Sequence, residues 1–118
     1  MSQHHYACTW KGQPITIMMG WDRPLQGYFM VIEHDDFNGD DEGFIYSNLN
    51  DPELKPSRGM SQSVGYLLER LIGLGLKVPQ RMLDAIEADA KVNAGNREVW
   101  YDHKGNVVAS VSDEDVAS

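Results

Sequence analysis

The chain has 118 residues, of which 42% are hydrophobic, and its formal net charge is −8 at pH 7. This length and apolar content predict one α+β domain over residues 1–118, with residues 112–118 expected to fray. The charge argues against nucleic acid as a direct partner. Phosphate neutralisation needs clustered cations, and the ten Lys and Arg residues are scattered along the chain.

The sequence also indicates where the protein works. The longest apolar runs are far shorter than a membrane span, and no stretch resembles a signal peptide, so we expect no membrane partner. The single cysteine, Cys8, has no second thiol in the chain with which to form a disulfide. That usage is typical of a reducing compartment and predicts a cytoplasmic location.

Six short segments have the composition of β-strands, rich in aromatic and β-branched residues. The turn signals between them are Gly12-Gln13, Asn38-Gly39 and Lys104-Gly105, which predict three hairpins. The connector 48–60 contains two prolines and is expected to be irregular. The predicted strands are residues 5–11, 14–20, 27–33, 43–47, 97–102 and 106–111.

Two amphipathic helices are predicted between residues 59 and 95, because apolar residues recur there at the helical spacing. Ser61 is expected to cap the first helix, and Gly73 and Gly75 to end it. Pro79 suits the first position of the second helix, and Gly95 its C-terminal end. The apolar faces comprise Val64, Leu67, Leu68, Leu71 and Ile72 in the first helix and Met82, Leu83, Ile86 and Ala90 in the second.

The assembled expectation is an antiparallel sheet of five or six strands with the two consecutive helices packed on one face. Neither helix is long enough to be stable alone, so each must cover an apolar surface. The order of the strands does not follow from the sequence. The last hairpin can pair with either edge of the sheet or form a small sheet of its own.

The acidic residues are concentrated in one interval, because no Lys or Arg occurs between Arg23 and Lys55. Three interpretations of its central loop, residues 34–42, stay open. The loop is simply solvated, or it binds Ca²⁺ in the manner of an EF-hand, or its carboxylates meet a basic patch on another protein. The calcium interpretation lacks the glycine and glutamate that the EF-hand pattern requires. The candidate partner-binding carboxylates are Asp35, Asp36, Asp40, Asp41 and Glu42.

A second candidate for partner binding is the loop Trp21-Asp22-Arg23. Tryptophan and arginine are the residue types that anchor protein interfaces. The structural alternative is that Trp21 covers one end of the core while Asp22 caps a turn or pairs with Arg23.

No pattern of catalytic, cofactor-binding or metal-ligating residues is found in the sequence. His4 and His5 would point to opposite faces of a strand, and no paired-histidine or paired-cysteine motif occurs. We therefore expect all four histidines, including His34 and His103, at the surface or in turns. Cys8 lacks neighbouring charges and is expected to be a buried structural thiol.

These observations predict a small, acidic, non-enzymatic protein that binds a basic protein partner. By charge and size alone it is similar to the anti-restriction and anti-CRISPR inhibitors of phages and plasmids, which mask nucleic-acid-binding surfaces. An alternative is a metal-dependent enzyme or enzyme accessory that uses carboxylates between Glu33 and Glu42, with His34. Another is a structural homodimer joined through a strand edge or through the helix pair.

Overall fold

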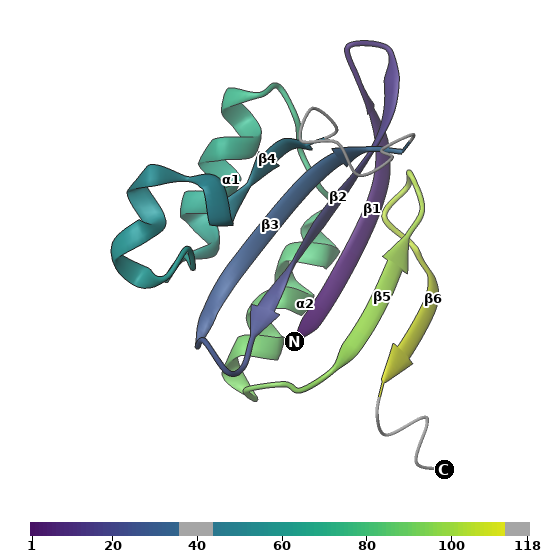
Figure 1. The fold of residues 1–118 in the computed structure, drawn as a ribbon. Helices are drawn as coiled ribbons and strands as arrows, with labels where there is room; N and C mark the ends of the chain where they lie inside the picture. Colours follow the sequence, from purple (N-terminus) through teal and green to yellow (C-terminus); the bar gives the residue numbers. More distant parts are fainter. Residues whose placement is uncertain (36–43, 113–118) are drawn as a thin grey trace.

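The computed structural model describes residues 1–35 and 44–112, which form a six-stranded sheet with both α-helices on one face (Figure 1). The α+β class and this layer arrangement confirm the prediction. The strand order is β4-β3-β2-β1-β5-β6. The strands are β1 (Ser2–Trp10), β2 (Gln13–Asp22), β3 (Gly27–His34), β4 (Phe44–Ser47), β5 (Arg97–Tyr101) and β6 (Val107–Ser112).

One strand pair was not foreseen, because the first and fifth strands run parallel. Strands β1 to β4 form an antiparallel meander, and β5 and β6 form the antiparallel last hairpin. That hairpin joins the sheet beside β1, with Ser2 opposite Arg97 and Tyr6 opposite Tyr101. A parallel pair needs a long crossover connection, which the two helices supply.

The core lies between the sheet and α1 (Val64–Gly73) and α2 (Gln80–Lys91). Neighbouring strands contribute aligned residues, so that Ile17 lies opposite Ile32 and Met19 opposite Met30. Full burial of an aliphatic side chain of this size contributes about 1.5–3 kcal/mol. The fully buried side chains include Ile15, Ile17, Met19, Met30, Ile32, Leu67, Leu71, Met82 and Ile86.

The start of α1 differs from the prediction. Ser63, not Ser61, caps the helix, and its hydroxyl accepts a hydrogen bond of 3.0 Å from the amide of Gly65. Ser61 instead forms a backbone bridge with Tyr28, which anchors the connector to β3. The helix ends at Gly73 as predicted, and Gly75 adopts a positive φ of 77°.

The ends of α2 differ as well. Pro79 immediately precedes the helix as its N-cap residue and is not its first residue. The helix ends at Lys91, and the left-handed residue after it is Asn93 with a φ of 51°, so the prediction of Gly95 was wrong. Asparagine adopts this conformation more readily than most residues.

The connector between β4 and α1 is more regular than predicted. It contains two 3₁₀ helices, η2 (Asn48–Asn50) and η3 (Pro52–Ser57). Each begins with a side-chain cap, from Ser47 and Asp51 respectively. The predicted turn Asn38-Gly39 lies outside the described residues, as does the tail expected to fray except for Ser112 of β6. Within residues 1–35 and 44–112, neither α-helix has the length and apolar character needed to span a membrane.

Candidate protein-binding surface

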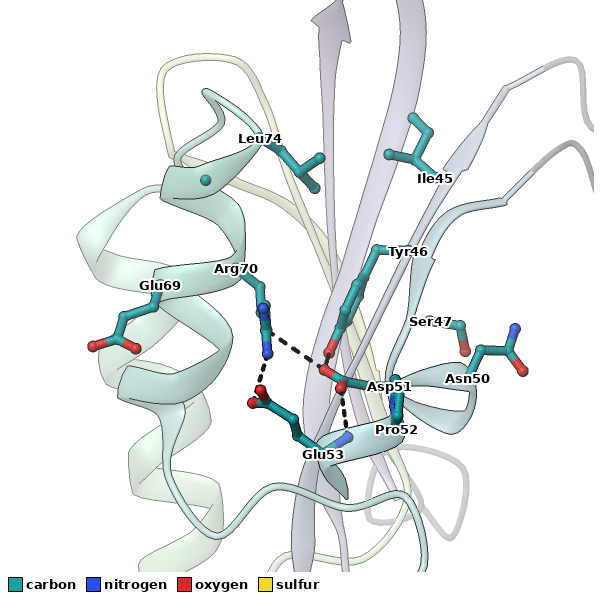
Figure 2. A pocket seen from close by; sticks show the side chains of 11 residues that line it. Ile45, Tyr46, Ser47, Asn50, Asp51, Pro52, Glu53, Glu69, Arg70 and Leu74 are labelled. Carbon is teal, nitrogen blue, oxygen red and sulfur yellow. Dashed lines mark hydrogen bonds and ion pairs between the residues drawn. The ribbon is translucent and has the colours of Figure 1, made fainter. Parts of the chain in front are cut away.

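A cavity of about 710 Å³ opens between α1, β4 and η3 (Figure 2). Its centre is Asp51, whose carboxylate accepts hydrogen bonds of 2.7 Å from the Tyr46 hydroxyl and 2.8 Å from the Tyr66 hydroxyl. The amide of Glu53 donates a third hydrogen bond of 3.0 Å to the same carboxylate. Asp51 therefore caps the N-terminus of η3, and its hydrogen bonds link η3 to both β4 and α1.

Arg70 supplies the positive charge of this cavity. Its Nη2 lies 2.7 Å from Oε2 of Glu53, and its Nε lies 3.5 Å from Oδ2 of Asp51. The guanidinium also packs over the Tyr66 ring, 4.8 Å from the ring centroid. Glu69 points away from these groups (Figure 2). The charges inside the cavity are thus matched to one another, which indicates a structural junction.

The pKa of Asp51 reflects this arrangement. Burial alone would raise it, but the hydrogen bonds from Tyr46, Tyr66 and Glu53, together with the charge of Arg70, hold the pKa below its ordinary value. Burial and the bond to the carboxylate raise the pKa of the Tyr46 hydroxyl. Both shifts favour an ionised Asp51 that accepts from neutral tyrosines.

A second polar cluster is buried between β1, β5 and α2. Nε2 of His4 lies 2.7 Å from Oδ2 of Asp89, and its Nδ1 lies 2.8 Å from the Tyr101 hydroxyl. Arg97 donates a hydrogen bond of 2.7 Å to the other oxygen of Asp89. His4 is 0% exposed, so its predicted surface position was wrong. The missed signal is the alternation of β1, which places His4 on the helix-covered face.

The remaining histidines and the cysteine have no catalytic arrangement among the described residues. His5 stacks on Trp100, with ring centroids 5.1 Å apart, and His103 lies exposed in the last hairpin. The thiol of Cys8 is partly buried, and burial, followed by the nearby Asp35, raises its pKa. Within 1–35 and 44–112, no group of three or more His, Cys, Asp or Glu residues could hold a metal ion.

Most of the predicted acidic site falls on residues that the structure does not describe: Asp36, Asp40, Asp41 and Glu42. Asp35 is exposed and accepts a hydrogen bond of 2.6 Å from the Thr16 hydroxyl. Glu33 and His34 are neighbours in β3, so their side chains point to opposite faces of the sheet. The structure therefore does not bring Glu33, His34 and Asp35 together as a ligand set.

The Trp21-Asp22-Arg23 segment is engaged mainly within the molecule. Trp21 Nε1 donates a hydrogen bond of 3.0 Å to the Asn93 side chain, and its ring meets the Tyr28 ring edge-on. Asp22 is buried, and its carboxylate accepts from the Leu25 amide, which is the turn-capping role considered as an alternative. Of the three residues, Asp22 is buried, Trp21 is partly exposed and Arg23 is exposed.

Sequence reasoning missed the face of the sheet opposite the helices. A continuous row of side chains crosses all six strands on this face, as the strand registers show. Its neighbours within each strand alternate onto the covered face. We call this surface the open face. The row consists of Ser47, Val31, Met18, His5, Trp100 and Ala109.

The open face is only partly covered by the rest of the chain. The connector overlies one end of this face. There Met60 lies so close to Gly27 that a Cβ atom on Gly27 would clash with it. Elsewhere Met18, Val31 and Trp100 are partly exposed, and Ala109 is exposed. An apolar and aromatic centre of this kind is typical of the core of a protein interface.

The charged residues of the open face have one sign. Along the described strands, alternation places Asp22, Glu33 and Glu98 on this face and no Lys or Arg. Glu98 lies 3.2 Å from Nε2 of His5 and is 44% exposed at its side chain. Strand alternation indicates which residues point away from the helix-covered face, but only the register reveals that these residues align across the strands.

No protein-family model, curated protein or solved structure matches this chain.

Proposed function

We propose that the protein is a non-enzymatic binding module that docks a basic protein partner on its open face. The observation that supports this most directly is the composition of that face. Trp100, Met18 and Val31 provide an apolar centre, and the charged strand residues beside it are all carboxylates. Tryptophan is among the commonest energetic anchors of protein interfaces.

We further propose that the acidic loop adds to this surface. Asp35 is exposed and follows directly on β3, the strand that carries Glu33. Asp36, Asp40, Asp41 and Glu42 are proposed to add negative charge beside the open face. Such charge accelerates encounter with a basic partner and selects it, more than it adds affinity.

A concrete form of this function is inhibition of a nucleic-acid-handling protein. Carboxylates on the module would occupy the basic surface that otherwise binds phosphates. The partner would then bind either this protein or nucleic acid, and added nucleic acid would displace it. We also propose a cytoplasmic location, because the single cysteine suits a reducing compartment.

The test is affinity capture with variants of the open face. Wild-type protein immobilised on a resin should retain a basic protein from a cell lysate, and the retention should weaken as salt is raised. Trp100→Ala should reduce affinity roughly thirtyfold or more, the loss expected at an interface anchor. Glu33→Gln combined with Glu98→Gln should slow association.

The matched control removes two charges from the other side of the molecule. Asp84 and Glu87 are exposed on α2, so Asp84→Asn combined with Glu87→Gln changes the net charge equally. This control should leave capture unchanged. Equal capture by wild type and by the folded Trp100→Ala variant would contradict the proposal.

A further inference from the structure

The last strand, β6, is an unprotected edge of the sheet (Figure 1). Its inner side pairs with β5, and no described element lies along its outer side. Val107, Val108 and Val111 are 47%, 62% and 48% exposed. Among residues 1–35 and 44–112, no strand pairs with the backbone groups along this outer side, and exposed valines flank them.

The other edge of the sheet is different. β4 has only four residues, and the connector continues that edge through the bridge between Tyr28 and Ser61. Proteins commonly protect an edge with a short strand, a charge or a proline. β6 has six residues, Val-Val-Ala-Ser-Val-Ser, none of which is charged or proline. It carries none of those three protections, and its one irregularity is the register shift with β5 between Trp100 and Tyr101.

We propose that β6 is a self-association edge, where two copies of this chain pair β6 with β6 in antiparallel orientation about a two-fold axis at Ala109. That axis places Ala109 of one copy opposite Ala109 of the other. Val107 and Val111 do not form a pair on one face, because the register shift between Trp100 and Tyr101 puts Val107 on the face of Tyr101 and Val111 on the face of Glu98. Each strand supplies the amide and carbonyl groups that the other requires. The result is a twelve-stranded sheet, twice the six strands of one copy.

The composition of β6 is compatible with a second copy at this edge. Each copy carries a net charge of −8, so most contacts between copies bring like charges together. β6 itself contains no charged residue, so pairing β6 with β6 brings no like charges within the two strands together. Main-chain hydrogen bonds between the two strands then supply the attraction.

The size of the contact sets its strength. Six residues of strand span about 20 Å, and an edge-to-edge contact of that length buries less than the roughly 1,200 Å² of a standard stable interface. The dimer is therefore weak and dependent on concentration. A two-fold contact uses the same edge on both copies, so it closes as a dimer and does not propagate into a filament.

The first test is sedimentation velocity of the purified full chain over a range of concentrations. Wild type should shift from monomer to dimer as concentration rises. Val111→Lys should weaken the dimer about tenfold, because it places a lysine of each copy on the pairing edge, where charge opposes strand addition. Within its own chain the new lysine faces Glu98, so the β5–β6 hairpin is preserved. The control is Val92→Lys, which makes the same change at a valine that is 74% exposed beyond α2.

The second test is disulfide trapping. In a Cys8→Ala background, Ala109→Cys should form an intermolecular disulfide under mild oxidation, because residues facing each other across the axis have Cα atoms about 4.5–5.5 Å apart. Val92→Cys should not. A wild type that stays monomeric at every concentration would overturn the proposal. So would a dimer that survives Val111→Lys and is not trapped at position 109.

Discussion

His4 and Asp89 are 85 positions apart in the chain, yet Nε2 of His4 lies 2.7 Å from Oδ2 of Asp89 in the buried interior. Burying a polar pair without full hydrogen bonding is costly. Here the Tyr101 hydroxyl meets the other ring nitrogen of His4, and Arg97 meets the other oxygen of Asp89. The cluster thereby fixes β1 against both α2 and β5.

Replacing Asp89 should therefore destabilise the fold strongly. Asp89→Ala leaves His4 and Arg97 without their acceptor, and the free energy of unfolding should fall by about 3 kcal/mol. Urea denaturation followed by circular dichroism measures this loss. Asp84→Ala, an exposed position on the same helix, should change stability by less than about 0.5 kcal/mol. Equal effects at the two positions would show that the buried cluster contributes nothing specific.

Acid should weaken the protein through two carboxylates. Burial would raise the pKa of Asp89, but hydrogen bonds from His4 and Ser2 and the charges of His4 and Arg97 lower it; the pKa of Asp51 is lowered likewise. In the unfolded chain both titrate near the ordinary value of about 3.9. Their contribution is complete above that value and is lost as pH falls through the lower folded pKa.

The measurement is the urea midpoint of wild type and of Asp89→Asn over an acidic pH series. Wild-type stability should fall as pH drops below about 4, and the variant should show a shallower fall from a lower starting stability. Identical slopes in the two proteins would mean that Asp89 titrates alike in the folded and unfolded states.

The junction around Asp51 should respond to loss of a single hydroxyl. Tyr46→Phe removes the hydrogen bond of 2.7 Å to the buried carboxylate and should lower the free energy of unfolding by about 1–2 kcal/mol. Tyr28→Phe is the matched control, because the Tyr28 hydroxyl has no hydrogen-bond partner among the described residues. Thermal unfolding of the two variants side by side gives the difference. A smaller effect at Tyr46 would contradict the assigned role of Asp51.

Two glycines should respond in opposite directions to alanine. A Cβ atom on Gly20 would overlap the carbonyl oxygen of Ser2 in the neighbouring strand and press on the Phe29 ring. Gly20→Ala should therefore cost about 3 kcal/mol or more, measured by urea denaturation. Gly73, at the end of α1, has open space around its Cβ position, and Gly73→Ala should stabilise by about 0.5–1 kcal/mol. Destabilisation by both would mean that Gly73 is constrained by something other than space.

Local patterns predicted the elements of this fold but not their assembly. The spacing of Leu67 and Leu71 identified α1 and its buried face. The choice of Ser63 over Ser61 as its cap depends on a bridge to Tyr28, more than thirty residues earlier in the chain, which no local pattern contains. Asn93 and Gly95 are both residue types that can adopt the left-handed conformation at the end of a helix. After α2, it is Asn93 that adopts it, with a positive φ.

In the open face, too, the individual strands follow from local patterns, but the way they pair does not. Trp100 and Met18 can be read from the sequence as strand residues, but they share a face only because β5 pairs with β1 and β1 with β2. The parallel pairing also explains the burial of His4, whose partners Asp89 and Tyr101 come from distant segments. Tertiary context decided these positions, and it overrides local preference in sheets most of all.

The place of β1 in the sheet has a consequence for how the chain folds. β1 pairs on one side with β2, which is close in sequence. On its other side it pairs with β5, whose first residue, Arg97, lies opposite Ser2. Loops of this length close slowly, and contacts between distant residues slow folding as a whole. During synthesis on the ribosome, β1 therefore has an unpaired side until residues 97–101 have been made.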